Sequence, residues 1–369
     1  MKVQPSAITG PRARTLGIDF PGTPGAWNAI TDVAGVEVGY STIISGAGKL
    51  VRGVGPIRTG VTAILPRARE GIPCFAGCSS FNGNGEMTGT LWIEETGELH
   101  TPITISNTHS CGTCRDATLR WIVDTDYGGS QPWGLPVAAE TYDGELNDIN
   151  GFHVTNQHVF DALNSAASGP IALGSVGGGT GMCTYEFKAG SGSSSRLIDI
   201  AGSRYTVATF VQSNFGLRDE LMVSGVAVGK ELKGGEFRSK GSGSVIAVVA
   251  TDAPLMPHQL KRLARRVPIG LARTGTIGHH SSGDIFLAFS TANKNALNNE
   301  RQVLRSIQYL SEDQLDPLFH GVAQTVEEAV IDSMIVNNTM TGANDLTVRA
   351  LPQEQLLTLL KKQGRLRES

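Results

Sequence analysis

Short apolar runs, each bounded by Gly, Pro or Asn, recur along the chain and predict β-strands. The runs at 245–250 and 285–289 are almost uninterrupted. Uninterrupted runs are typical of strands that are covered on both faces, so we expect layers on either side of a sheet. The predicted strands are Val61–Leu65, Ile103–Ser106, Ile171–Leu173, Tyr205–Val211, Val245–Ala250 and Ile285–Phe289.

Other segments place apolar residues at helical spacing. The predicted helices begin at Pro257, after Thr155, near Leu315 and after Pro352, and the apolar stripe of the first continues to Val267. Strands and helices are interspersed without strict alternation, which favours a layered α+β or α/β architecture. The sequence contains no repeat and no convincing linker, so we expect one domain over residues 1–369.

The composition and charge of the chain limit the kinds of binding partner that we expect. The 369 residues are 40% hydrophobic and 18% charged, with a formal net charge of −3, so a core is expected and a basic face for nucleic acid is not. The sequence shows no signal-peptide pattern and no apolar stretch of transmembrane length, which predicts no membrane attachment. The odd number of cysteines, five, indicates reduced thiols and a cytoplasmic location.

Common cofactor motifs are absent. The chain has no P-loop, no dinucleotide fingerprint, no H-E-x-x-H and no G-x-S-x-G. One zinc site is conceivable, from Cys74, Cys78, Cys111 and Cys114 with His109 nearby. The spacing of the first pair is irregular for a structural zinc site, so small buried hydrophobic thiols are the favoured interpretation. We therefore expect neither a metal nor an organic cofactor.

One serine stands where a loose loop meets a buried strand, in "KGSGSVIAVVATDAPL" at 240–255. From these residues alone, an ordinary loop entering a core strand is favoured. The alternative is cleavage between Gly243 and Ser244, which would leave Ser244 with a free α-amine. Such an amine has a pKa of about 7.7–8.0, so it is partly neutral near pH 7 and could act as the base for its own hydroxyl.

Several long motifs resemble the L-aminopeptidase/D-esterase family, which includes the DmpA-type β-peptidyl aminopeptidases. Among them are "NAITDVAGVEVGYSTI" (28–43), "LGSVGGGTGM" (173–182), "VQSNFG" (211–216), "GSVIAVVATDAPL" (243–255) and "SSGDIFLAFSTAN" (281–293). The resemblance implies a four-layer αββα sandwich like that of N-terminal-nucleophile hydrolases, with different connections. It also implies self-cleavage into 1–243 and 244–369 and tetramers of the cleaved unit.

The same resemblance implies roles for single residues. Ser244 is the nucleophile and, through its amine, the base, and the cut falls after Gly243. Ser282 and Asp284 orient the nucleophile, with Asp284 one methylene shorter than the Glu found in many relatives. The remaining positions are Asn214 as oxyanion donor, Tyr142 as a second donor, Glu140 for the substrate's ammonium group, and 177–181 as pocket wall. From the residues alone, turns and a solvated acidic loop explain these positions as well.

The function that follows is a serine aminopeptidase acting on short peptides, amino-acid amides or esters through an acyl-enzyme. Two alternatives stay open. The ornithine acetyltransferases share the fold type and self-cleavage, but they use threonine where this chain has Ser244. An uncleaved binding protein on the same scaffold is the other. The sequence does not distinguish α-L, D and β-amino residues as substrates.

Overall fold

We describe a computed structural model that covers residues 10–125, 127, 132–241, 243–298 and 303–367. These residues form two main sheets. The first has the order β1-β2-β5-β6, with β5 and β6 parallel and the other pairs antiparallel. Its strands are β1 (Glu37–Ser45), β2 (Ile57–Arg69), β5 (Ile103–Asn107) and β6 (Val137–Thr141).

The second main sheet has the order β4-β3-β12-β11-β10-β9. Only β11 and β12, at its centre, are parallel. Two short hairpins, β7–β8 and β13–β14, stand apart. The strands are β3 (Cys74–Gly83), β4 (Glu98–Leu99), β7 (Cys183–Thr184), β8 (Phe187–Lys188), β9 (Ser191–Ile200), β10 (Ser203–Phe215), β11 (Gly243–Thr251), β12 (Gly283–Ser290), β13 (Met340–Thr341) and β14 (Thr347–Val348).

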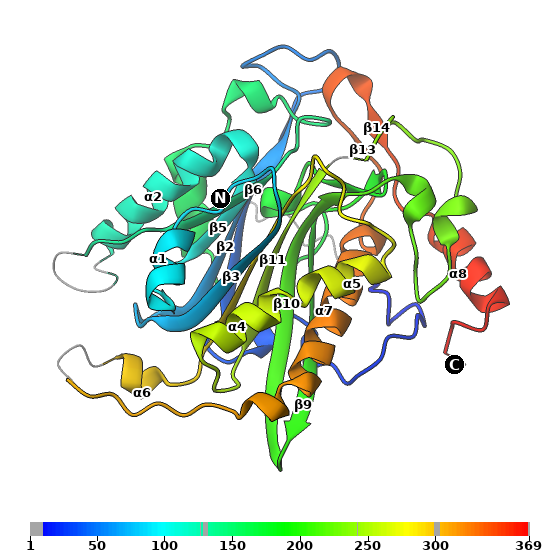
Figure 1. Cartoon of the computed structure of the whole chain (residues 1–369). Coiled ribbons are helices and arrows are strands. Elements are labelled where there is room, and N and C mark those ends of the chain that lie inside the picture. The colour runs from blue at the N-terminus through cyan, green and yellow to red at the C-terminus, as the bar shows by residue number, and fades with distance from the viewer. Residues whose placement is uncertain (1–9, 126, 128–131, 242, 299–302, 368–369) are drawn as a thin grey trace.

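Helices cover the outer face of each sheet, and the two sheets pack against each other (Figure 1). In that view the layers run from α2 on the left to α7 on the right. The helices are α1 (Thr90–Thr96), α2 (Cys111–Asp124), α3 (Asn156–Asn164), α4 (Pro257–Ala264), α5 (Val267–Arg273), α6 (Lys294–Leu297), α7 (Asp316–Ile335) and α8 (Gln353–Lys362). The expected four-layer αββα sandwich is confirmed.

Strand β11 explains why its sequence is apolar throughout. Val245, Ala247 and Val249 pack in the core beneath α4, α5 and α7, whereas Ile246 and Val248 pack in the core between the sheets. Successive side chains of a strand point to opposite faces, so both parities must be apolar when both faces are covered. The central strand is therefore held rigidly from both sides.

Two local predictions were wrong. Residues 171–173 form no strand, because the Ala172 carbonyl accepts from the Tyr40 hydroxyl at 2.9 Å instead of from a neighbouring strand. The stripe from Pro257 to Val267 is divided between α4 and α5. Pro268 stands in the first turn of α5, where its missing N–H needs no partner, so the second helix starts there.

The cysteines do not converge on a metal site. Cys74 and Cys78, on β3, lie in the core between the sheets, and Cys111 and Cys114, on α2, lie beyond the four-stranded sheet. Burial raises the pKa of Cys74 to about 11 and that of Cys114 to about 12, which keeps these thiols protonated. Small buried hydrophobic thiols, the favoured interpretation, describe them correctly.

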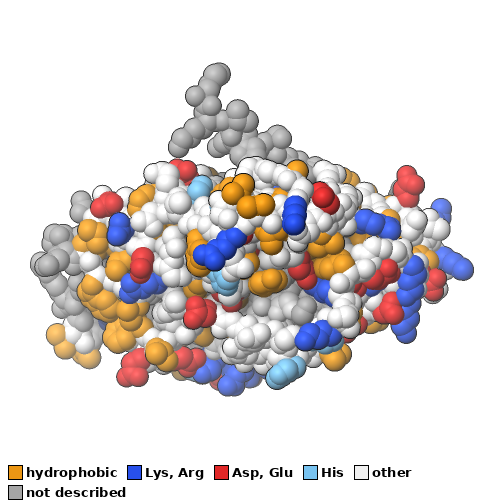
Figure 2. Space-filling view, turned by 90° about the horizontal axis from the view of Figure 1, so that it is seen from above, with side chains coloured by type: hydrophobic (Ala, Val, Ile, Leu, Met, Phe, Trp, Pro, Cys, Tyr) orange, Lys and Arg blue, Asp and Glu red, His pale blue; other side chains and the backbone are white. Residues whose placement is uncertain are grey.

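The surface charges and the helices were inspected for signs of a nucleic-acid-binding face or of a membrane span. The face seen from above carries acidic and basic side chains interspersed with hydrophobic ones (Figure 2). Within the described ranges, every helix is too short or too polar to cross a membrane.

Candidate active site

Ser244 lies at the beginning of β11, between β10 and β12. Its neighbours across the two ladders are Asn214 on β10 and Gly283 on β12. The residue is 5% exposed, and Oγ donates to the Gly243 carbonyl at 2.8 Å and accepts from the Gly283 N–H at 3.1 Å. A rigid central strand thus holds the hydroxyl beside the peptide group of the Gly243–Ser244 bond.

Gly243 occupies a position that only glycine fits. Its φ of 129° lies in a region that side chains disfavour, and a Cβ added there would stand 1.9 Å from the Asn214 carbonyl oxygen. The close approach comes from the pairing of β11 with the end of β10. A glycine before Ser244 is therefore a requirement of the strand geometry, whatever else it does.

Ser282 and Asp284 are hydrogen-bonded to each other, and their i, i+2 spacing places both side chains on one face of the strand entry. Ser282 Oγ donates to Asp284 Oδ1 at 2.6 Å, and Asn82 Nδ2 donates to Oδ2 at 2.9 Å. Burial raises the pKa of Asp284, and the hydrogen bonds from Ser282 and Asn82 oppose that rise. The aspartate, although shorter than glutamate, reaches Ser282.

This pair lies behind the nucleophile. Asp284 is paired with Val245, whose side chain faces the helices, whereas Ser244 is paired with Gly283. The carboxyl group and the Ser244 hydroxyl are therefore on opposite faces of the sheet. Gly283, between Ser282 and Asp284, connects the pair to Ser244 through its N–H. Any amine formed at residue 244 would emerge at the end of the strand, between the two faces.

The Asn214 carboxamide is fixed at both ends. Its Oδ1 accepts from the Cys183 N–H at 2.9 Å, and its Nδ2 donates to the Tyr142 carbonyl at 2.7 Å. Because an amide nitrogen has two N–H groups, one donor is left for another acceptor. Tyr142 is half-exposed, and burial raises the pKa of its hydroxyl, which therefore stays protonated as a donor.

Glu140, the last residue but one of β6, carries a buried carboxylate. It is 1% exposed, and its Oε1 accepts from the Glu86 N–H at 3.0 Å. Burial raises the pKa of Glu140, while hydrogen bonds from the Thr108 hydroxyl and the Glu86 backbone lower it. Such a carboxylate is suited to a cation brought in by a ligand, because no arginine or lysine is bonded to it within the described residues.

A cavity of about 640 Å³ joins most of the expected residues. Glu140, Tyr142, Asn214, Gly243 and Ser244 all line it. Ser282 and Asp284 stand outside the lining, on the far side of the strand end. The volume fits a ligand of a few residues, and Ser244, Asn214 and Glu140 line the space that it would occupy.

The glycine-rich stretch 177–181 was expected to form a wall of the pocket, but it is not part of the lining of this cavity. It packs between strands instead of lining this cavity. A Cβ at Gly178 would stand 2.2 Å from Gln212 Oε1 and 2.5 Å from the Ile105 carbonyl oxygen. Close backbone packing, and not ligand contact, explains the lack of side chains there.

The sequence analysis missed the end of β3 together with the loop that follows it, "NGNGE" at 82–86. Asn82 holds Asp284, Asn84 Nδ2 donates to the Ser281 carbonyl at 2.7 Å, and Glu86 holds Glu140. Two consecutive Asn-Gly pairs look like a plain turn signal. Their position at the end of an apolar strand was the feature that could have drawn attention to them. The neighbouring sequence does not show which distant residues they bind.

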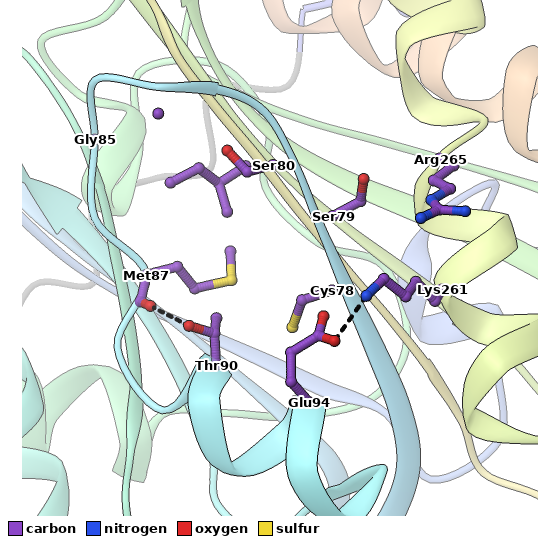
Figure 3. Close-up of a pocket in the computed structure, with 11 residues that line it drawn as sticks. Cys78, Ser79, Ser80, Gly85, Met87, Thr90, Glu94, Lys261 and Arg265 are labelled. Carbon is purple, nitrogen blue, oxygen red and sulfur yellow. Dashed lines mark hydrogen bonds and ion pairs between the residues drawn. The ribbon is translucent and has the colours of Figure 1, made fainter.

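A second cavity, of about 470 Å³, borders the other side of this loop. It shares Gly83 and Gly85 with the first cavity, and it is flanked by α1 and α4 (Figure 3). Lys261 Nζ donates to Glu94 Oε2 at 2.7 Å across it, and Arg265 is the C-cap residue directly after α4, the helix that carries Lys261. None of the residues expected to be catalytic lines it.

The chain was compared with known proteins. Residues 28–348 match the model of Peptidase family S58. The beta-peptidyl aminopeptidase BapA of Sphingosinicella microcystinivorans is 50% identical over 377 residues, covering 98% of this chain and 94% of the relative. The enzyme of the same name from Sphingosinicella xenopeptidilytica is 43% identical over 376 residues, covering 96% and 92%.

A solved structure is similarly close. The L-aminopeptidase D-Ala-esterase/amidase of Ochrobactrum anthropi superposes with a TM-score of 0.92 at 47% identity, covering 97% of this chain and 100% of that chain. That protein is described as a prototype for the serine aminopeptidases and as a new variant among the Ntn hydrolase fold. Both sheets and both helical layers described above therefore have a counterpart of known structure.

Proposed function

The chain belongs to peptidase family S58, and on that premise we propose that it is a self-processing serine aminopeptidase acting through an acyl-enzyme on Ser244. One observation carries the assignment of the nucleophile. Ser244 Oγ lies at the head of a rigid buried strand, beside the Gly243 carbonyl, in a cavity that also presents Asn214 and Glu140. A serine in this position has both a scissile bond and a substrate site within reach.

Activation is the first step of the proposal. Ser244 Oγ attacks the Gly243 carbonyl carbon, the C–N bond breaks, and an ester forms while the nitrogen takes up a proton. Water then hydrolyses the ester, which leaves a carboxylate at Gly243 and a free amine at Ser244. The products are subunits of residues 1–243 and 244–369. What supports this is the 2.8 Å contact of Ser244 Oγ with the Gly243 carbonyl oxygen.

Turnover uses the new amine. With a pKa of about 7.7–8.0, it is partly neutral near pH 7 and takes the hydroxyl proton as Oγ attacks the substrate carbonyl. Asn214 and Tyr142 donate to the developing oxyanion, and the ammonium returns its proton to the leaving amine. Water releases the acyl group. Ser282 and Asp284 hold the amine in position in this proposal, which is supported by the bond from the N–H of Gly283, the residue between them, to Ser244 Oγ.

The substrate class follows from Glu140 and from the relatives. A buried carboxylate in the cavity suits the ammonium group of an N-terminal residue. We propose short peptides, amino-acid amides and esters as substrates, with β-amino residues included because the 50% identical relative is a beta-peptidyl aminopeptidase. The acyltransferase and the uncleaved binding protein, the two alternatives, find no support in the comparisons.

The experiment that tests this function has two measurements. In denaturing mass spectrometry, active protein should consist of two chains, and the smaller one should begin Ser-Val-Ile. A panel of p-nitroanilides with α-L, D and β-amino residues should be hydrolysed by the same preparation. Full-length chain as the sole species in active protein would overturn self-processing, and a panel left intact by cleaved protein would overturn the aminopeptidase activity.

The pH profile should show the state of Glu140. Because burial raises its pKa, the carboxylate becomes protonated as pH falls through a range above the usual value of about 4.3. Only the ionised form attracts an ammonium group, so kcat/KM should fall at that point. A second fall in kcat/KM should occur as pH drops below the pKa of the Ser244 amine, about 7.7–8.0, because only the neutral amine takes the hydroxyl proton. In Glu140→Gln the lower limb should vanish while the upper one stays, and an unchanged lower limb would contradict the role of Glu140.

Location and assembly complete the proposal. All five cysteines are free and buried, which supports a reducing, cytoplasmic compartment. A homo-oligomer, a tetramer of cleaved units, is supported by large apolar side chains on the surface. Leu91 is 87% and Trp133 is 68% exposed, and Trp133 lies edge-on to Trp92 with ring centroids 6.0 Å apart. Exposed apolar clusters of this kind are typical of subunit contacts.

A further inference from the structure

We propose that Lys240 binds the C-terminal carboxylate of short peptide substrates, and that residues 237–241, upstream of the cut, stay in place as a wall of the mature site. This inference rests on the proposed function. It names the peptides that the site prefers, namely those with a free carboxylate at a short distance from the N-terminal ammonium group. Lys240 lines the same cavity as Ser244 and Glu140, three residues before the scissile bond.

The segment is anchored upstream of Lys240 by a buried arginine. Arg238 Nε and Nη2 donate to the two carboxylate oxygens of Glu145 at 2.9 and 2.8 Å, and the Arg238 side chain is 4% exposed. The backbone N–H groups of Phe237 and Arg238 both donate to Glu186 Oε1 at 2.6 Å. Bidentate and charge-assisted bonds of this kind are among the strong polar contacts in proteins.

A second anchor lies directly downstream of Lys240. Ser281 Oγ donates to the Gly241 carbonyl at 3.2 Å. The Gly241 backbone also lies so close to the His279 ring that a Cβ would stand 2.1 Å from Nδ1. Both anchors are independent of the bond between Gly243 and Ser244. Breaking that bond therefore leaves the chain seated on either side of Lys240.

The charges around the cavity favour a zwitterionic ligand. Glu140 and Glu86 supply two carboxylates, and Glu145 compensates Arg238. Lys240 is exposed and has no ion-pair partner among the residues that the structure describes. It is thus an uncompensated cation in a cavity that also holds an uncompensated buried carboxylate at Glu140. A short peptide with both termini free matches this pair of charges.

The substrate carboxylate could instead bind in the second cavity, which lies across the loop that contains Gly83 and Gly85. There Glu94 already compensates Lys261, whereas Arg265 has no ion-pair partner within the described part of the chain (Figure 3). Arg265 does not line the cavity of Ser244. Lys240 is therefore the better placed of the two, and a parallel variant of Arg265 separates them.

The test compares one dipeptide with its C-terminal amide, using the N-terminal residue that the enzyme accepts best. For Lys240→Gln, KM for the free dipeptide should rise about tenfold with kcat little changed, because the carboxylate contact is the same in ground and transition states. Both constants for the amide should stay unchanged, and Lys240→Arg should restore the dipeptide KM. The matched control is Lys233→Gln, which removes a lysine of the same segment that pairs with Asp219 outside the cavity. All rates are expressed per cleaved chain.

Each outcome decides the proposal. Loss confined to the free dipeptide supports it. Equal loss for dipeptide and amide, no loss at all, or the same selective loss in Arg265→Gln instead of Lys240→Gln would overturn it. If wild-type protein hydrolyses neither substrate, the proposed function fails, and the carboxylate site fails with it.

Discussion

Ser244→Ala should yield one uncleaved chain of 369 residues with no measurable aminopeptidase activity. In the proposed mechanism the same hydroxyl attacks Gly243 and the substrate, so the substitution removes both reactions, and without the cut no amine forms. Loss of a catalytic serine in other hydrolases lowers kcat by about 10⁶, so activity should fall below detection. Denaturing mass spectrometry and a p-nitroanilide assay on the same sample measure both effects.

A control separates this from general damage. Ser80 lies on β3 of the same sheet and borders the second cavity, so Ser80→Ala should cut and turn over normally. The Ser244→Ala chain should also keep the wild-type circular dichroism spectrum, because the hydroxyl is a small part of a well-packed strand. Two fragments from Ser244→Ala, with a cut after Gly243, would refute the assignment.

Asn214→Asp should lower kcat by about 10²–10³, which corresponds to about 2.7–4 kcal/mol of lost oxyanion stabilisation. The replacement has the same shape, but it exchanges the N–H donors for a carboxylate oxygen. That oxygen would face the Tyr142 carbonyl, now held by Nδ2 at 2.7 Å, and the developing negative charge. Because Asn214 is the cross-strand neighbour of Ser244, self-cleavage should slow as well. The measurements are kcat per cleaved chain and the time course of cleavage.

The matched variant is Asn84→Asp. Asn84 lines the same cavity, but its Nδ2 donates to the Ser281 carbonyl, away from the Ser244 ladder. It introduces the same negative charge into the cavity without removing the proposed oxyanion donor, so kcat should change far less. Equal losses in both variants would assign the effect to charge alone and contradict the role of Asn214.

Some features of the candidate site could be predicted from the sequence, and others could not. Ser244 stood out because a glycine-rich loop meets an uninterrupted apolar strand there, whereas the hydrogen bond between Ser282 and Asp284 became known only from the structure. The strand at 171–173 failed, because an apolar run does not reveal whether a partner strand is available. The loop at 82–86 was missed for a related reason, since its partners Asp284, Ser281 and Glu140 are far away in the chain.

The sequence by itself determined the layered architecture and singled out Ser244 as the proposed nucleophile. Apolar periodicity is a local property, and it decides which strands need covering on both faces. Only the tertiary structure decided that Asp284 lies behind Ser244, that Asn82 holds it, and that Arg238 is tied to Glu145 beside the cavity. Those relations depend on strand order and register, which arise from packing between segments that share no local pattern.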